Sequence, residues 1–151
     1  MSFVNLVMLP MLARFFLVVM FPFSAYDKIV HWDAAMRQAR SAPIPGSAAM
    51  LGAAVCVEFL TPVCIVLGWH DRLAAFILAG FCVVTALLYH PFWNFSDFWS
   101  KDGEGRAHFW DFWKNFGLTG GLLLLVIGGS FAPFGYVVTH PLSAVPYAAA
   151  P

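Results

Sequence analysis

Charged residues are scarce in this sequence. Lys, Arg, Asp and Glu together make up 11% of the 151 residues and hydrophobic residues 61%, whereas soluble domains carry about 25% charged residues. A chain of this length folded in water would expose a large apolar surface, which soluble proteins avoid. The eight basic and eight acidic residues cancel, so no net charge attracts nucleic acid. The composition excludes a soluble domain and predicts an integral membrane protein embedded in lipid.

Cysteine is scarce as well, and sequence motifs for redox cofactors are missing. Cys56, Cys64 and Cys82 lie in apolar runs, where thiols act as small buried hydrophobic groups rather than as a disulfide framework. The sequence has no glycine fingerprint for a dinucleotide, no cysteine cluster and no CxxCH haem-attachment motif. We therefore expect no intrinsic cofactor or metal, and no electron transfer by the isolated chain. Because no basic segment precedes the first apolar run, we also expect no cleaved signal peptide.

Four apolar stretches approach the roughly 20 residues that a helix needs to cross a bilayer. They cover residues 4–26, 47–69, 73–89 and 112–130. The runs are continuous rather than alternating, which favours helices over a β-barrel. Pro10, Arg14 and Pro22 interrupt the first stretch, so this helix is either bent or preceded by an interfacial segment. The sequence predicts an all-α bundle of four transmembrane helices over residues 1–130, followed by a Pro-rich tail over 131–151 that forms no long helix.

The distribution of basic residues favours one orientation in the membrane. With four spans, the first and third connections lie on one side, and they contain Lys28, Arg37, Arg40, Lys101 and Arg106. The second connection contains only Arg72. The positive-inside rule then places the first and third connections in the cytoplasm and both termini in the periplasm of a bacterial inner membrane. Arg14 counts for the opposite orientation if the first ten residues are interfacial.

The segment 90–116 contains ten Phe and Trp residues among Asp, Lys, Asn and His, with a turn at 102–105. Aromatic side chains of this kind gather at the membrane–water interface. The segment predicts an interfacial helical hairpin between the third and fourth spans. An aromatic belt is the simpler interpretation, and the wall of a pocket for a flat lipophilic ligand such as a quinone is the alternative.

Ionisable residues are predicted inside two of the spans. Arg14 lies near the middle of the first if that span starts at residue 4, and Glu58 lies near the middle of the second. Each alone costs about 2.5–3.5 kcal/mol on insertion scales, so we predict an intramembrane ion pair between them. This pair is either a structural clamp or a functional one, with Glu58 carrying a proton or bonding to a quinone.

A polar cluster is predicted where the fourth span begins. His108, Asp111 and Asn115 share one helical face with Lys114 on its flank, and His90 ends the third span on the same membrane side. The candidate quinone or lipid pocket consists of His90, Trp93, His108, Asp111, Trp113, Lys114 and Asn115. Interfacial histidines are the simpler interpretation, and a metal or haem between His90 and His108 is chemically possible. Gly117 and Gly121 form a small-xxx-small pair that predicts close helix packing.

The chain also resembles a known family through four blocks, which cover most of it up to residue 129. They read ARFFLVVMFPFSAYDKI, GAAVCVEFLTPVCIVLGWHDRLAA, LLYHPFW and HFWDFWKNFGLTGGLLLL. In this order they resemble the DoxX-like family of small four-helix bacterial membrane proteins. The matching polar positions are Arg14, Asp27, Lys28, Glu58, His90, His108, Lys114 and Asn115. The family supplies no catalytic role for them.

The resemblance implies a role beside other proteins. Family members are described as membrane components of oxidoreductase systems, including a subunit linked to thiosulfate:quinone oxidoreduction, and as membrane anchors in redox-stress complexes. We therefore expect a subunit of a quinone-linked oxidoreductase or respiratory complex that anchors other membrane subunits or handles a bound quinone, without being catalytic alone. Two alternatives stay open: an assembly or structural membrane protein, and a small-solute transporter that works as a homo-oligomer.

Overall fold

The computed structural model describes residues 3–42 and 45–127, and these are helical apart from turns and one loop. The helices are α1 (Leu9–Val18), α2 (Met20–Val30), α3 (Trp32–Ser41), α4 (Ser47–Leu67), α5 (Asp71–Tyr89) and α6 (Glu104–Ile127). A π-helical turn, η1 (Val4–Met8), precedes α1, and a 3-10 turn, η2 (Phe92–Asn94), follows α5. No strand occurs among these residues, which confirms the all-α class. The predicted Pro-rich tail and the last residues of the predicted fourth span lie outside them.

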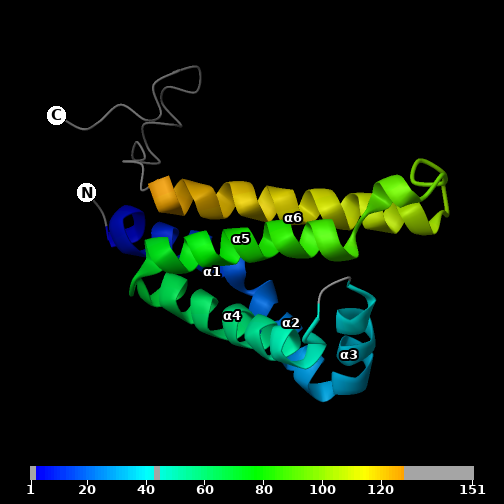
Figure 1. Cartoon of the computed structure of the whole chain (residues 1–151). Coiled ribbons are helices and arrows are strands. Elements are labelled where there is room, and N and C mark those ends of the chain that lie inside the picture. The colour runs from blue at the N-terminus through cyan, green and yellow to red at the C-terminus, as the bar shows by residue number, and fades with distance from the viewer. Residues whose placement is uncertain (1–2, 43–44, 128–151) are drawn as a thin grey trace.

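The long helices run up and down in one bundle (Figure 1). Helices α5 and α6 lie side by side, α4 packs against α5, and α1 and α2 cover the other side of α4. The start of α1, the α4–α5 turn and the end of α6 lie at one end of the bundle. The connection from α2 to α4 and the loop from α5 to α6 lie at the other end, as the sequence predicted for the first and third connections.

The bundle has a small core and a large apolar exterior. Its fully buried side chains come from several helices, namely Val18, Ile65, Leu78, Cys82 and Leu122. Large apolar side chains such as Phe23, Leu67 and Phe76 are at least 60% exposed on the outside. This surface is unfavourable in water and suits contact with lipid tails. Cys64 is half-buried and Cys56 is exposed, so only Cys82 fits the predicted burial, and all three thiols are free.

Within residues 3–42 and 45–127, three helical segments are long and apolar enough to cross a membrane, namely Leu9–Val30, Ser47–Leu67 and Asp71–Asn94. They match the first three predicted spans. Helix α6 is not among them, because its first half carries charged residues from Glu104 to Lys114 before its apolar run. The helix itself is present, and its status as a fourth membrane span stays a prediction.

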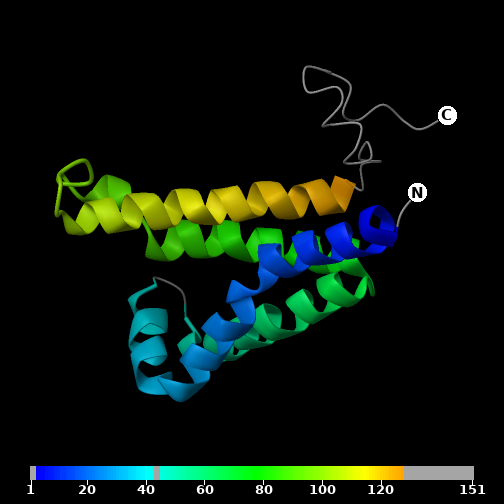
Figure 2. The same ribbon diagram turned by 180° about the vertical axis from the view of Figure 1, so that it is seen from behind.

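The first span is bent in its middle. A bend was one of the two alternatives that the sequence left open for this span. The break between α1 and α2 falls at Val19, and the ribbon changes direction there (Figure 2). Pro22 explains this position, because its ring nitrogen has no hydrogen to donate to the carbonyl of Val18, four residues earlier. The bend carries α2 across α4.

Helix α3 lies within the predicted first connection, where the apolar pattern of the sequence did not predict a helix. Its ten residues are too few and too polar to cross a bilayer. Asp33 in its first turn and Arg40 in its last turn suit the helix dipole. Ala39 and the following Ala42 are buried, whereas the two arginines of this helix are exposed. The helix therefore packs through small residues and turns its charges outward.

A tight turn joins α4 to α5. Gly68 adopts a φ of 70°, in the left-handed region that side chains disfavour, and the N–H of Trp69 donates to the carbonyl oxygen of Cys64 at 2.9 Å. This is a Schellman motif, which satisfies carbonyls that the helix end leaves free. It reverses the chain so that α4 and α5 run antiparallel.

The predicted interfacial helical hairpin is wrong in its first arm. After Pro91 the chain forms only the short turn η2 and a loop of turns up to residue 103, and residues 92–103 together form the aromatic loop. Turn-forming residues, among them Ser96, Asp97 and Asp102, favour local hydrogen bonds over a helix here. The loop folds back on the start of α6, where the Phe92 ring contacts those of Phe109 and Phe112. Aromatic packing, rather than a second helix, holds it in place.

Helix α6 approaches α1 through one glycine of the predicted pair. A Cβ atom on Gly121 would lie 2.9 Å from Cδ1 of Leu17, whereas one on Gly117 or Gly120 would meet nothing within 4 Å.

The replacement Gly121→Leu is therefore expected to cost about 1–3 kcal/mol through overpacking. Gly120→Leu, its neighbour on the same helix, should be neutral or stabilise by up to about 1 kcal/mol through helix propensity. Equal unfolding midpoints of the two variants in detergent would contradict this contact.

Candidate functional site

A cavity of about 620 Å³ opens between α2, α3, α4 and α5. Most of its wall is apolar, with alanines from α3 and α4 and larger side chains from α5. Its polar lining residues are Ser24, Asp27, Lys28, His31, Gln38, Glu58, Thr85, Tyr89, His90 and Asn115. A largely apolar cavity of this size with a few converging polar groups is typical of a site for a small organic ligand.

The most buried charge in this cavity is neutralised by a lysine from α2. The Nζ atom of Lys28 donates to Oε2 of Glu58 at 2.8 Å and to Oε1 at 2.9 Å. Lys28 also donates to Oγ of Ser24 at 2.6 Å, and the Ser24 hydroxyl donates to Oε1 of Glu58 at 3.1 Å. The Glu58 side chain is 5% exposed and that of Lys28 25%. The carboxylate is thus paired and hydrogen-bonded, as a charge inside a membrane requires.

The predicted ion pair between Arg14 and Glu58 is wrong. Arg14 instead binds Asp71, with Nη2 of the arginine 2.7 Å from Oδ2 of the aspartate. The described membrane span begins at Leu9, so Arg14 lies in its first turns, beside the α4–α5 turn, and not at the depth of Glu58. Asp71, the first residue of α5, lies at that same end and is the nearer partner.

Sequence reasoning missed Lys28 as the partner because it placed this residue in the connection after the first span. Helix α2 continues to Val30, so Lys28 stays helical and lies one turn after Ser24. Phe21, Ser24 and Lys28 follow one another at i, i+3 and i+7, and all three line the cavity. That spacing was the available signal, since it places a serine and a lysine on the face that carries a buried phenylalanine.

Only two members of the predicted seven-residue pocket line the cavity. His90 and Asn115 lie at its edge, where the end of α5 meets α6. The rings of Trp93, in the loop after α5, and Trp113, in α6, instead contact the ring of Phe112 in α6. Asp111 and Lys114 form an exposed ion pair with 3.0 Å between Oδ1 and Nζ.

His108 does not line the cavity, but its ring contacts that of His90, which does. Their ring centroids are 5.6 Å apart, and the Nδ1 atom of each ring is buried without a hydrogen-bond partner. A stacked contact with Phe95 holds the His108 ring at 4.8 Å between centroids. Across 3–42 and 45–127 no group of three His, Cys, Asp or Glu side chains is arranged to hold a metal ion.

The comparisons with known proteins identify the family. The DoxX family model matches residues 9–91, which is more than half of the chain. The chain belongs to the DoxX family. It is 31% identical over 121 residues to the inner membrane protein YphA of Escherichia coli K12, covering 79% of this chain and 81% of that protein. It is 30% identical over 119 residues to the inner membrane protein YqjF of the same organism, covering 79% and 82%. No solved structure matches the chain.

The family match coincides with the cavity. Residues 9–91 span α1 to α5, which contribute every cavity-lining residue except Asn115. The aromatic loop from Phe92 and all of α6 lie beyond the DoxX match. In this DoxX membrane protein the Lys28–Glu58 pair lies within the residues that the family model matches, whereas the Asp111–Lys114 pair lies beyond them.

Proposed function

We propose that this DoxX protein is a subunit of a quinone-linked oxidoreductase in a bacterial inner membrane, where it holds a quinone beside the Lys28–Glu58 pair. The cavity between α2 and α5 is the observation that carries this proposal. A quinone has a flat ring with two carbonyl oxygens and an apolar tail. The cavity offers apolar walls for the ring and tail, and an amide and an imidazole at Asn115 and His90 for a carbonyl oxygen.

The chemistry of the lining residues supports a handling role rather than a redox role. Lysine, glutamate, serine, histidine and asparagine can donate or accept protons and hydrogen bonds, but they do not change oxidation state under ordinary conditions. Full reduction of a quinone to a quinol consumes two electrons and two protons. The electrons would come from a redox centre on a partner subunit, and Glu58 with Lys28 could pass protons to the ring. The proposed partners are therefore other membrane subunits of a redox complex.

The proposed membrane arrangement has four spans. The names of YphA and YqjF describe inner membrane proteins, which supports the same location for this chain. Helix α6 lies along α5, a membrane-length helix, so the apolar second half of α6 would share its depth (Figure 1). We further propose that the α2–α4 connection and the α5–α6 loop face the cytoplasm, since five of the eight basic residues lie in them or in the adjoining turns of α2 and α6.

Quinone binding can be tested by filling the cavity. Ala54 lines it from α4, so Ala54→Phe should weaken binding of a short-chain ubiquinone analogue at least tenfold in titration calorimetry with detergent-solubilised protein. Ala48→Phe on the same helix is the matched control, because residue 48 is exposed and lies outside the cavity lining. Wild-type protein that binds no quinone, or equal affinities of the two variants, would contradict the proposal.

A structural role is the second candidate, and one observation favours it. The three hydrogens of the Lys28 ammonium group match its three acceptors, one oxygen on Ser24 and two on Glu58. A group satisfied in this way can clamp α2 to α4 without any ligand. Under this alternative, Ala54→Phe and Ala48→Phe would leave the assembly of partner subunits unchanged, whereas loss of the pair would release them.

A further inference from the structure

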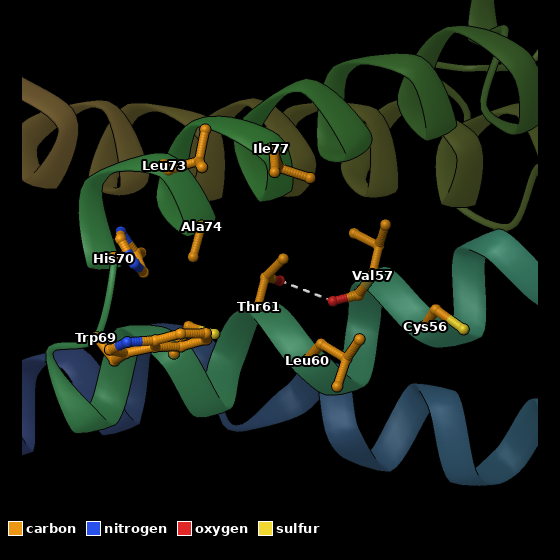
Figure 3. A pocket seen from close by; sticks show the side chains of 10 residues that line it. Cys56, Val57, Leu60, Thr61, Trp69, His70, Leu73, Ala74 and Ile77 are labelled. Carbon is orange, nitrogen blue, oxygen red and sulfur yellow. Dashed lines mark hydrogen bonds between the residues drawn. The ribbon is translucent and has the colours of Figure 1, made fainter.

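A second hollow, of about 400 Å³, lies between α4 and α5 near their connecting turn (Figure 3). Leu60, Thr61 and Cys64 line it from α4, and Leu73, Ala74 and Ile77 line it from α5. Figure 3 shows Trp69 and His70 at the end where the turn joins the two helices. Thr61 and Ala74 have small side chains, so the hollow lies above them and between the larger side chains of the two helices.

Between the two helices, away from Trp69 and His70, the wall of this groove offers no free polar group. Its hydroxyl group, on Thr61, donates to the carbonyl oxygen of Val57 at 2.7 Å and is therefore occupied (Figure 3). No carboxylate or ammonium group lines the groove, in contrast to the cavity at Glu58. Away from the turn, a lining of this composition favours hydrocarbon, and a carbonyl oxygen would find no free donor between the two helices.

The groove lies where hydrocarbon is its neighbour. Both walls belong to helices long and apolar enough to cross a membrane, Ser47–Leu67 and Asp71–Asn94. Leu60 and Leu73 on its rim are each 59% exposed, so the described part of the chain leaves this face uncovered. In a bilayer the open side of the groove faces lipid tails.

The turn end of the groove carries a net positive charge. Asp71 is neutralised by Arg14 at 2.7 Å, which leaves Arg72, exposed in the first turn of α5 two residues after His70, as the remaining charge of this turn. Trp69 and His70 pack edge to face, with their ring centroids 4.8 Å apart, and their N–H groups are donors suited to headgroup depth. An anionic phosphate complements this end, and an acyl chain complements the groove that leads away from it.

We propose that the groove between α4 and α5 binds one anionic phospholipid, with an acyl chain between Leu60, Thr61, Ala74 and Ile77 and the phosphate at Arg72 and His70. This site is separate from the Lys28–Glu58 cavity and does not depend on the quinone proposal. Its occupant is a membrane lipid selected by charge at one end and by an apolar groove at the other.

Native mass spectrometry of delipidated protein, with dioleoyl phosphatidylglycerol and dioleoyl phosphatidylcholine added in turn, tests this site. We expect one tightly bound phosphatidylglycerol per chain, with phosphatidylcholine at least tenfold weaker. Arg72→Gln should remove this preference by weakening phosphatidylglycerol about tenfold, the loss of about one charge-assisted hydrogen bond. Arg106→Gln, an exposed arginine in the first turn of α6, is the matched control and should bind as the wild type does.

Groove-filling variants test the acyl-chain part. Cys64→Phe and Ile77→Trp fill the groove from opposite walls and should abolish tight binding of both lipids. Phe76→Trp, on the lipid-facing side of α5 outside the groove lining, should not. The proposal is overturned if the filled variants retain wild-type lipid binding, if Arg72→Gln and Arg106→Gln behave alike, or if filling the groove instead dissociates a homodimer.

Discussion

Replacing Lys28 with methionine is expected to destabilise the protein by about 3 kcal/mol, because it leaves the carboxylate of Glu58 buried without its cation. The pair is closed at 2.8 Å, and the glutamate side chain is 5% exposed. Removal of one partner of such a pair costs more than the pair contributes, since the remaining charge keeps its desolvation penalty. Unfolding in mixed micelles, followed by circular dichroism, measures the loss.

Two further variants separate this effect from a general cost of losing lysine. Lys114→Met breaks the ion pair with Asp111, in which the lysine side chain is 69% exposed and the aspartate side chain 43%. Because this pair is exposed, its loss should cost less than about 1 kcal/mol. The double variant Lys28→Met with Glu58→Leu should recover most of the stability, because apolar replacements of a buried pair are often neutral. If Lys28→Met costs no more than Lys114→Met, the buried pair is not formed.

The double variant also bears on function. A structural clamp predicts that the recovered stability restores assembly with partner subunits. Proton transfer to a quinone predicts a stable protein whose complex no longer reduces quinone, because leucine at position 58 cannot carry a proton. The Lys28–Glu58 pair is therefore the place where the two candidate functions can be separated.

The sequence predicted most of the helices because membrane helices follow from a simple physical rule. Continuous apolar runs must satisfy their backbone internally, so residues 47–69 and 73–89 correspond closely to α4 and α5. The same rule misplaced the start of the first span, because hydropathy alone does not separate η1 from α1. It also missed α3, whose amphipathic residues form a helix that packs on the bundle without crossing a membrane.

Partner choice among the charges could not be predicted from residue type. Arg14 and Glu58 looked like natural partners because both lay inside predicted spans, yet pairing depends on depth and on the direction of each side chain. Asp71 reaches Arg14 because the Schellman turn at Gly68 starts α5 there. Lys28 reaches Glu58 because the break at Val19 carries α2 across α4. Both contacts depend on turns whose geometry the apolar pattern does not encode.

Replacing Gly105 with alanine is expected to destabilise the protein by about 2 kcal/mol, although a glycine-to-alanine change inside a helix normally stabilises it. A Cβ atom at this position would overlap Cβ of Phe95 and lie 2.7 Å from Oδ1 of Asp97 and 3.0 Å from the backbone nitrogen of Phe98. The N–H of Gly105 also donates to Oδ1 of Asp97 at 3.2 Å. The aromatic loop therefore packs directly on the backbone of the first turn of α6, and a methyl group there must displace it.

Gly117→Ala and Gly120→Ala on the same helix are the matched controls, because a Cβ atom at either position meets nothing within 4 Å. Both should stabilise the protein by up to about 1 kcal/mol, so the sign of the effect reverses at Gly105. Thermal unfolding in detergent gives the stability of all three variants, and tryptophan fluorescence reports on the loop through Trp99, whose ring contacts that of Phe109. A stabilised Gly105→Ala variant with unchanged fluorescence would show that the loop does not pack on α6, and the aromatic segment would then be free to bind a partner subunit or the membrane surface.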